Sequence, residues 1–312
     1  MASPSASPDK SAASPSLVAL ALAQERAQGV AAVLGHLGHN PVRGQEVLLK
    51  PNLNTADPCP GSSHNDTLAA LIQALWDMGA ASITLGERSY LPTSQVLEQK
   101  GLPPLLERLG VATLAFDELP EKDWVEVRPP GSHWPQGFRV ARPVLESPCL
   151  VSTCCLKTHQ YGGVFTMSLK LHVGVVPGGR QGFPYMKHLH DSPHQRLMIA
   201  EINQAFRPAL VLLDGLEAFV SGGPMEGRRA KAGIFLASAG DRVALDAVAV
   251  AMLKHLGATP EIMGRPVFAQ EQIKRAAELG LGAASAAGIA ISAPDSAGLQ
   301  LAQSLGDILN QG

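Results

Sequence analysis

Short apolar runs of strand length alternate with helical patterns along most of this chain. The expected strands fall at residues 17–22, 47–50, 83–85, 111–116, 149–155, 210–213, 233–237 and 289–292. The expected helices fall between them, most clearly at residues 67–78, 194–206, 241–256 and 266–279. Such alternation is typical of parallel sheets, whose crossover connections are usually helical. The sequence therefore predicts an α/β fold with a largely parallel, doubly wound sheet and helices on both faces.

The region from residue 117 to residue 147 interrupts this alternation. Its periodicity fades and Pro and Trp recur, which predicts a small insertion of β-hairpin or loop structure over the sheet. Residues 1–16, MASPSASPDKSAASPS, are rich in Ser, Pro and Ala, so a disordered tail is expected there. No linker divides the remainder, and residues 17–312 are expected to form a single α/β domain.

Composition argues against several classes of partner. The net charge is −2 with both signs scattered, so no basic face indicates a nucleic acid and no polybasic run indicates a membrane surface. No apolar stretch reaches the ~20 residues that span a bilayer, and the first residues lack the pattern of a secretory signal. A cytoplasmic protein with no nucleic-acid or membrane partner is expected, and its oligomeric state is left open.

The four cysteines, Cys59, Cys149, Cys154 and Cys155, have neither the density nor the spacing of a disulfide framework. They also lack the closely spaced pattern of a cluster-binding segment, so no iron–sulfur cluster is expected. The adjacent Cys154 and Cys155 are expected to be unbridged residues of a buried strand.

Residues 151–177, VSTCCLKTHQYGGVFTMSLKLHVGVVP, contain the densest group of candidate functional side chains. Among glycines and behind an apolar run, the segment carries Lys157, His159, Ser168, Lys170 and His172. Ligands of open α/β sheets bind beyond the carboxyl ends of the strands. The sequence therefore predicts that polar residues from several strand ends line one concavity, namely Lys50, Lys157, His159, Lys170 and Asp214.

The positive charges of this group suggest an anionic ligand. Lys50, Lys157 and Arg180 are expected to hold the anion, because a buried cation requires a negative partner. Lys50 has an alternative role in a structural salt bridge with a nearby Asp or Glu. His159 and Lys170 are expected to transfer protons, since a neighbouring Lys keeps His neutral and an apolar environment lowers the pKa of an amine. The alternative for Lys170 is a surface position on a helix.

Other polar and glycine positions complete the predicted site. Asn52 and Ser168 are expected to contact the ligand, although Asn52 fits equally well as a cap of its own loop. Asp214, counted with the catalytic residues, either accepts a ligand or orients a neighbouring His or Lys. Gly222 and Gly223 either allow the backbone to approach a ligand or form a turn.

His188, His190 and His194 lie close together in the sequence. On an extended segment, a His-x-His pair projects both rings to one side, which suits a transition metal. The alternative is a proline-bounded loop that carries histidines without a metal. A transition metal is therefore one candidate cofactor.

Several segments resemble, in order, the domain of unknown function 362 family. They are VLLKPN, GSSHNDTLAALIQALWDMGAASITLGERS, LKTH with SLKLHVGVVP, LVLLDGLEAFVSGGPMEG and GDRVALDAVAVAML. The resemblance extends from about residue 17 to residue 293. Members of that family often carry a ferredoxin-like cluster module, for which this sequence has no cysteine pattern, so electron transfer is not supported.

The segment HQYGGVFTMSLKLHVGVVPG, with the histidines after it, is similar at the site level to nickel-pincer lactate racemases. The likeness implies that Lys170 takes the position of the cofactor-linked lysine and that His188 or His190 takes the position of the metal ligand. The sequence departs from the pattern, because Ser168-Leu169 stands where Gly-Gly usually precedes the lysine. The likeness therefore extends only to the fold and the site.

Together these residues predict an enzyme that acts on a small anionic organic molecule by Lys and His acid–base chemistry, with metal assistance as an option. Its reaction class is left open between isomerase- or racemase-like and oxidoreductase-like. One alternative is a binding protein for an anionic cofactor or metal complex without turnover, and another is an accessory iron–sulfur-type redox protein without its own cluster module. No G-x-G-x-x-G or Walker loop indicates nucleotide binding, and no G-x-S-x-G indicates an α/β-hydrolase nucleophile.

Overall fold

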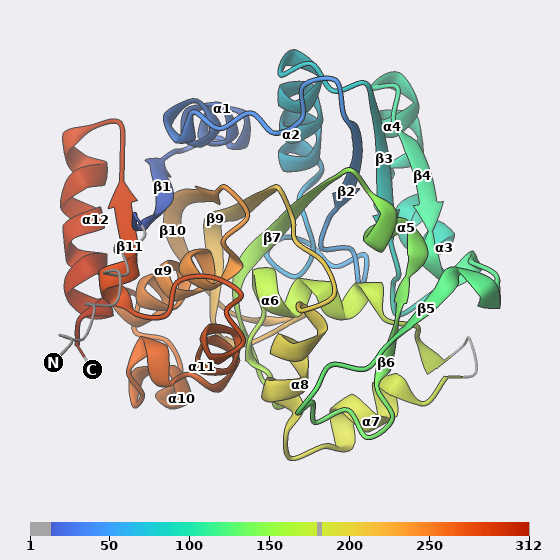
Figure 1. Ribbon diagram of the computed structural model, residues 1–312. Helices are drawn as coiled ribbons and strands as arrows, with labels where there is room; N and C mark the ends of the chain where they lie inside the picture. The colour runs from blue at the N-terminus through green and yellow to red at the C-terminus, as the bar shows by residue number, and fades with distance from the viewer. Residues whose placement is uncertain (1–13, 180–182, 312) are drawn as a thin grey trace, which may run out of the picture.

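The computed structural model describes residues 14–179 and 183–311, and one large sheet organises them (Figure 1). Its strands follow the order β11-β1-β10-β9-β7-β2-β3-β4, and β8 pairs with β7 off this path. The strands are β1 (Ser16–Leu22), β2 (Glu46–Lys50), β3 (Ser82–Glu87), β4 (Ala112–Ala115), β7 (Cys149–His159), β8 (Val164–Phe165), β9 (Leu210–Gly222), β10 (Gly227–Ser238) and β11 (Ile289–Ser292). On the path through the described residues, β10 alone runs opposite to its neighbours. The predicted largely parallel sheet is confirmed.

Helices cover both faces of the sheet, as in a doubly wound fold (Figure 1). One face packs against α1 (Arg26–Leu37), α2 (Asn65–Asp77), α3 (Thr93–Gln99) and α4 (Pro103–Arg108). The opposite face packs against α6 (Ser168–Leu171), α8 (Gln195–Ile202), α9 (Arg242–His255), α11 (Glu271–Glu278) and α12 (Ser296–Leu309). Because both faces are covered, every residue of β7 is buried.

The remaining helical segments are short. They are α5 (Arg142–Glu146), α7 (Tyr185–Asp191) and α10 (Pro260–Met263), with 3₁₀ turns η1 (Phe116–Glu118), η2 (Glu121–Asp123), η3 (His172–Val175), η5 (Val267–Ala269) and η6 (Ala286–Gly288). Most of them lie in connections between the larger elements.

The insertion that the sequence predicts ahead of β7 is a two-stranded antiparallel sheet of β5 (Trp124–Val127) and β6 (Phe138–Ala141). The buried Glu201 of α8 accepts a hydrogen bond from the backbone of His133 at 2.8 Å, in the loop of this hairpin. Arg275 of α11 donates to the same carboxylate at 2.8 Å. A buried carboxylate paired in this way attaches the hairpin to the helices beneath it.

Three central strands are several residues longer than the sequence predicts. β7 continues past Cys155 to His159, β9 continues past Asp214 to Gly222, and β10 begins at Gly227 instead of residue 233. Gly215, which suggested the end of a strand, lies inside β9, where the ladder with β10 contains irregularities of register instead of ending. The result is a long β9–β10 hairpin that extends beyond the edge of the parallel strands.

The sequence prediction omits helix α12, which follows β11. Asp295 caps this helix by accepting a hydrogen bond from the backbone of Gly298 at 2.7 Å. Leu305 and Leu309 then bury against the core on the side of α9. An Asp N-cap followed by apolar residues at helical spacing marks the start of a helix. This pattern at Asp295 could have predicted α12 from the sequence.

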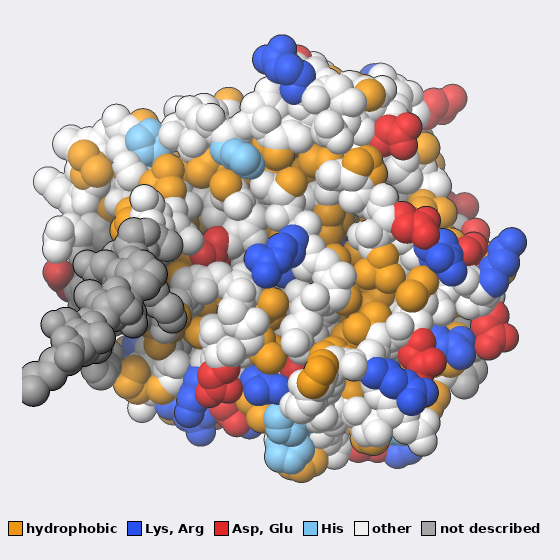
Figure 2. Space-filling view, viewed as in Figure 1, with side chains coloured by type: hydrophobic (Ala, Val, Ile, Leu, Met, Phe, Trp, Pro, Cys, Tyr) orange, Lys and Arg blue, Asp and Glu red, His pale blue; other side chains and the backbone are white. Residues whose placement is uncertain are grey.

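Within the described ranges, no helix is long and apolar enough to cross a membrane. The face drawn in Figure 2 mixes basic, acidic and hydrophobic side chains and shows no continuous basic patch. On this face the charge distribution agrees with the scattered charges of the sequence.

Candidate functional site

The end of β7 and the short helix α6 bring the principal candidates together. Strand β7 carries Lys157 and ends at His159, the chain then turns back, and β8 pairs with the last residues of β7. Helix α6 follows and carries Lys170. The start of α6 is fixed by the buried Asp246 of α9, which accepts hydrogen bonds from the backbone of Ser168 at 2.8 Å and of Leu169 at 3.0 Å. Two N–H groups at the start of this very short helix are thereby satisfied.

Lys170 and His159 flank one small space next to Gly163. A Cβ atom placed on Gly163 would lie 2.8 Å from Cε of Lys170 and 2.9 Å from Nδ1 of His159. A side chain at this position would therefore displace both groups. Glycine at position 163 allows the amine and the imidazole to approach the same backbone segment.

Among the described residues, no carboxylate acts on the buried Lys170 amine. The residue is 9% exposed, and its Nζ makes no hydrogen bond or ion pair with any residue that the structure describes. Burial, followed by the charges of Lys157 and Arg88, lowers the pKa of Lys170 to about 8. Burial of this side chain excludes the alternative of a surface position on a helix, and its place at a ligand pocket stays a prediction.

His159 is neutral at physiological pH. Burial, followed by the charges of Lys170 and Lys157, lowers the pKa of His159 to about 2. Its Nδ1 atom is buried and has no hydrogen-bond partner within residues 14–179 and 183–311. A buried, unsatisfied imidazole nitrogen in a polar site is a position where a ligand group would be expected.

Lys157 lies on the α1–α2 face of β7. Its Nζ donates a hydrogen bond to the carbonyl of Gly61, in the loop that follows β2. Burial lowers the pKa of Lys157, and the nearby thiols of Cys155 and Cys59 act in the opposite direction. One carbonyl leaves the remaining N–H groups of this amine available to a ligand.

Lys50 forms the structural ion pair that was its alternative role. Its Nζ lies 2.6 Å from Oε1 of Glu87, and both side chains are almost completely buried. A Cβ atom on Gly174 would lie 2.8 Å from Glu87 Oε1 and 3.0 Å from Lys50 Nζ, so the pair also packs closely beneath η3. Glu87 accepts a further hydrogen bond from the backbone of Leu53 at 2.8 Å. The charge of Lys50 is therefore already compensated within the protein.

Asn52 and Ser168 have protein partners of their own. The backbone of Asn52 donates to Ser63 Oγ at 3.0 Å and its side chain contacts the Gly61 carbonyl at 3.3 Å, as expected for a residue that caps its loop. The hydroxyl of Ser168 donates to Asp246 at 2.5 Å and belongs to the start of α6.

Asp214 orients neither a His nor a Lys. Its carboxylate accepts hydrogen bonds from Thr67 Oγ1 at 2.5 Å and from Arg26 Nε at 3.2 Å. The Cys59 thiol lies 4.0 Å from the same oxygen. Asp214 thus belongs to a polar cluster on the α1–α2 face, beside the group formed by Lys157, His159 and Lys170.

Gly222 and Gly223 form the turn of the β9–β10 hairpin. Both have positive φ angles, 74° and 73°, a conformation that favours glycine. The Gly222 carbonyl accepts a hydrogen bond from the Thr158 hydroxyl at 3.1 Å, which fixes the turn against the end of β7. The close backbone approach at these glycines is therefore to the protein's own strand.

The premise of a His-x-His pair on an extended segment is wrong, because His188 and His190 lie in helix α7. Residues two apart in a helix point to different sides. His190 contacts Gln195 at 3.1 Å, whereas His194 packs on the ring of His133 with centroids 4.7 Å apart. No group of three or more His, Cys, Asp or Glu side chains in the described part of the chain is placed to hold a metal.

The last two candidates are His172 and Arg180. His172 is fully buried and bridges Asn203 Oδ1 and Ser152 Oγ, each at 3.0 Å, so it is a structural residue of the core. Arg180 lies outside the described residues. Lys157, His159 and Lys170 therefore lie near enough for their charges to act on one another, and that they line one concavity stays a prediction. Lys50 and Asp214 are paired in adjacent clusters.

Arg88 was not among the predicted site residues, although it follows a strand end that the sequence analysis expected. It is buried at the end of β3, donates to the Val173 carbonyl at 2.9 Å and lowers the pKa of Lys170. The available signal was its place directly after a buried strand. Arg88 adds a third positive charge to the group.

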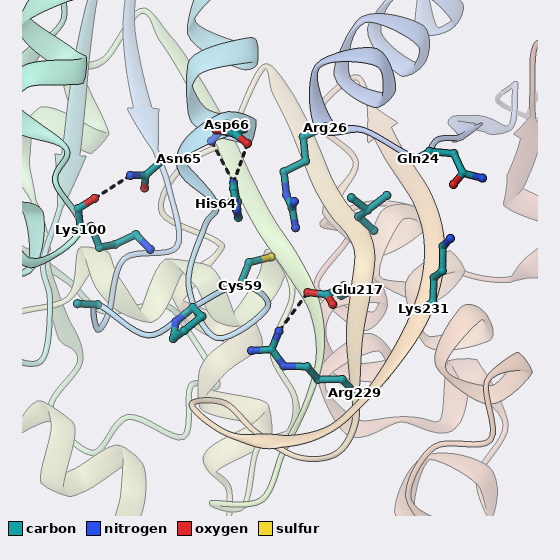
Figure 3. A pocket seen from close by; sticks show the side chains of 13 residues that line it. Gln24, Arg26, Cys59, His64, Asn65, Asp66, Lys100, Glu217, Arg229 and Lys231 are labelled. Atoms are coloured by element: carbon teal, nitrogen blue, oxygen red, sulfur yellow. Dashed lines mark hydrogen bonds and ion pairs between the residues drawn. The ribbon is translucent and has the colours of Figure 1, made fainter.

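Two pockets open beside these residues. One, of about 610 Å³, reaches His159 and is also lined by Thr158, Gln160, Gly162 and Arg196. The other, of about 750 Å³, lies over the α1–α2 face and has Cys59 in its lining, with Arg26, His64, Lys100 and Lys231 around it (Figure 3). The first gives a ligand direct access to the imidazole that lacks a partner.

Fold and site together define a largely parallel α/β protein that gathers buried amines and a neutral imidazole at the end of a central strand. The family described as Domain of unknown function (DUF362) matches residues 47–251, and the chain belongs to it. The resemblance noted in the sequence is thereby confirmed.

Proteins similar to the chain include one sequence relative and one solved structure. A thylakoid-associated protein of Synechocystis sp., sll1697, is 29% identical over 224 residues, which cover 71% of this chain and 67% of that protein. The lactate racemase apoprotein from Thermoanaerobacterium thermosaccharolyticum aligns with a TM-score of 0.40 and 13% identity. That alignment covers 64% of this chain and spans about half, 50%, of the racemase chain.

Proposed function

We propose that this protein is an enzyme that transfers a proton to or from a small anionic organic molecule, with Lys170 as the group that exchanges the proton and His159 as a hydrogen-bond acceptor for the substrate. The observation that carries the proposal is the buried Lys170 amine beside the unsatisfied Nδ1 of His159, with no carboxylate acting on that amine among the described residues. A bound anion supplies the negative charge that the described part of the site lacks.

Lys170 suits the proton transfer itself. With a pKa of about 8, Lys170 is mostly charged at neutral pH but loses its proton easily, so it serves as an acid and, once neutral, as a base. His159, with a pKa of about 2, is too weak a base to take that proton, so it stays neutral and accepts a hydrogen bond from the ligand at Nδ1. Lys157 and Arg88 hold the anionic group of the substrate by charge.

The pocket at His159 is the proposed entrance. Its volume of about 610 Å³ accommodates a small organic acid, and it is lined by the end of β7 and the turn of the β9–β10 hairpin. A cytoplasmic location is part of the proposal, and cell fractionation would test it separately from catalysis.

The proposal is tested with a panel of small hydroxy, keto and phosphorylated acids incubated with the protein in heavy water. Enzymatic proton transfer at carbon appears in NMR spectra as incorporation of solvent deuterium. Lys170→Arg keeps the charge but removes the titration near neutral pH, because guanidinium stays protonated. We expect this variant to lose exchange by ~10²–10⁴-fold while binding of the same acid changes by less than about tenfold.

Lys274→Arg is the matched control, because Lys274 is exposed on α11, outside the group formed by Lys157, His159 and Lys170. It should exchange at the wild-type rate. Unchanged exchange in Lys170→Arg would remove Lys170 from the catalytic role. Binding of an acid by the wild type without exchange of any acid in the panel would favour the alternative of a binding protein for an anionic cofactor.

A further inference from the structure

Two thiols lie beneath the larger pocket, and the proposed proton-transfer chemistry uses neither of them. Cys59 belongs to the loop after β2 and contributes to the lining of the pocket of about 750 Å³. In Figure 3 its sulfur lies between Arg26 and Glu217 at the inner end of the pocket. Cys155 lies in β7, deeper in the protein and 1% exposed. All four cysteines of the chain are free thiols in this structure.

The Asp214 carboxylate places the two thiols next to each other. Cys59 Sγ lies 4.0 Å from Asp214 Oδ2. Cys155 is the direct ladder partner of Asp214 in the parallel pairing of β7 with β9, so both side chains project from the same face of the sheet. Cys59 and Cys155 therefore lie next to the same carboxylate on the same face of the sheet.

The interaction between the two thiols favours ionisation of Cys155 over Cys59. The hydrogen bond from Cys59, and then the charge of Lys157, lower the pKa of Cys155 against the effect of burial. The pKa of Cys59 is raised, first by its interaction with Cys155, so Cys155 ionises first. Because a thiolate attacks a disulfide, the Cys155 thiolate serves first as the base that accepts the proton of Cys59.

We propose that Cys59 and Cys155 form a redox-active dithiol that small anionic disulfides reach through the larger pocket. The pocket lining holds four basic side chains against two carboxylates, so its net positive charge suits an oxidant that carries carboxylates. The basic side chains are Arg26, Lys100, Arg229 and Lys231, and the carboxylates are Asp66 and Glu217. This inference does not depend on the proposed proton-transfer function.

The thiol–disulfide exchange proceeds in two steps. Cys59 gives its proton to the Cys155 thiolate and, now a thiolate itself, attacks one sulfur of the small disulfide, whose other half leaves as a thiolate. Cys155 then loses a proton to solvent and attacks Sγ of Cys59, which releases the second half as a thiolate. The two protein thiols are oxidised to one disulfide, and the small disulfide is reduced to two thiols.

The test uses the whole native protein and 5,5′-dithiobis(2-nitrobenzoate), a small aromatic disulfide with two carboxylates and a coloured leaving thiolate. We expect the wild type to release two coloured thiolates per chain quickly and to retain no adduct. Peptide mapping should then find Cys59 joined to Cys155, and a reducing agent should restore both thiols.

Single variants separate the two roles. Cys155→Ser should release one coloured thiolate and keep the other half bound to Cys59, while Cys59→Ser should react roughly tenfold or more slowly, because Cys155 is shielded from solvent. Cys149→Ser is the matched control and should behave like the wild type, since Cys149 lies at the opposite end of β7, near the Pro41 carbonyl.

Wild-type protein that reacts no faster than Cys59→Ser, or that retains an adduct without a Cys59–Cys155 crosslink, would overturn the proposal. Peptide mapping of the wild type decides the matter even if a variant fails to fold.

Discussion

At the scale of single residues, the molecule is defined by how it compensates buried charge. Lys50 is compensated by Glu87 at 2.6 Å, whereas Lys170 has no carboxylate partner within the described residues. An uncompensated buried amine lowers the stability of the folded state unless its proton leaves or an anion binds. Removing the charge of Lys170 should therefore stabilise the protein, whereas removing the partner of Lys50 should destabilise it.

Lys170→Met tests the energetic cost of the uncompensated amine. The folded-state pKa of Lys170 is about 8 and its ordinary value is 10.5, so the unfolded chain binds this proton more tightly and the wild type gains stability as pH rises between these values. At pH 7 we expect the variant to be more stable than the wild type by about 1–3 kcal/mol, and the difference should disappear near pH 10.5. Urea denaturation at several pH values measures this.

Lys274→Met, at an exposed position, serves as the control and should change the free energy of unfolding by less than about 0.5 kcal/mol. A Lys170→Met protein less stable than the wild type at neutral pH would mean that the amine has a stabilising anionic partner.

Glu87→Gln tests the compensated pair. The amide still accepts a hydrogen bond but leaves Lys50 buried without a counter-charge, so we expect a loss of about 3 kcal/mol in the free energy of unfolding. The double variant Lys50→Met with Glu87→Gln should recover most of that loss, because it removes both charges. A single variant as stable as the wild type would show that the pair contributes little, and would reopen the ligand role for Lys50.

The sequence predicted the spatial grouping of residues that lie in one short segment. It did not predict contacts between residues that tertiary packing brings together from distant segments. Lys157, His159 and Lys170 lie close together in the sequence, so their grouping needed only one hairpin and one short helix. The Lys50–Glu87 pair depends on the register of β2 beside β3, and the contact of Cys59 with Cys155 depends on how the loop after β2 folds over β7. Neither arrangement is visible in local patterns.

At the scale of elements, α6 is a four-residue helix that cannot be stable by itself. Its position depends on Asp246 of α9, which accepts hydrogen bonds from two of its backbone N–H groups and from the Ser168 hydroxyl. Burial raises the pKa of Asp246 to about 6, although these hydrogen bonds oppose the shift. The element that carries Lys170 is thus held in place by a residue from a distant part of the chain.

Asp246→Ala is expected to release this element. Loss of the shared acceptor should lower the free energy of unfolding by about 2–4 kcal/mol, since buried donors are left unsatisfied. Lys170 should then react faster with trinitrobenzenesulfonate, as measured by peptide mass spectrometry. Asp295→Ala, which removes the cap of α12, should cost about 1 kcal/mol and leave Lys170 labelling unchanged. Equal Lys170 labelling in the two variants would contradict this account of α6.

Element boundaries were predicted unequally well. The strand at Ile289–Ser292 has the predicted bounds, whereas β9 passes through the Asp214-Gly215 signal because its ladder with β10 accommodates irregularities. The segment of helix α7, which lies between Pro184 and Pro193, was expected to be extended or a loop. In these cases tertiary contacts outweigh local preference.

At the scale of the whole molecule, the predicted α/β class and doubly wound sheet follow from alternation alone, but the strand order does not. β1 lies between β10 and β11, at the opposite end of the sheet from β3 and β4 (Figure 1). Apolar strands of similar composition, such as β1 and β2, carry no local information about which neighbour each will choose. The strand order depends on the crossover connections, whose helices must pack on one face of the sheet or the other.

The position of β1 also has a consequence for biosynthesis. The ribosome makes β1 early, yet Val18 pairs with Ser238, more than two hundred positions later. At translation rates of ~5–20 residues per second, this apolar strand waits about 10–40 s before its partner emerges. An unpaired apolar edge of this kind is a template for contact with other chains, so the nascent protein is expected to need chaperone protection until β10 has left the ribosome.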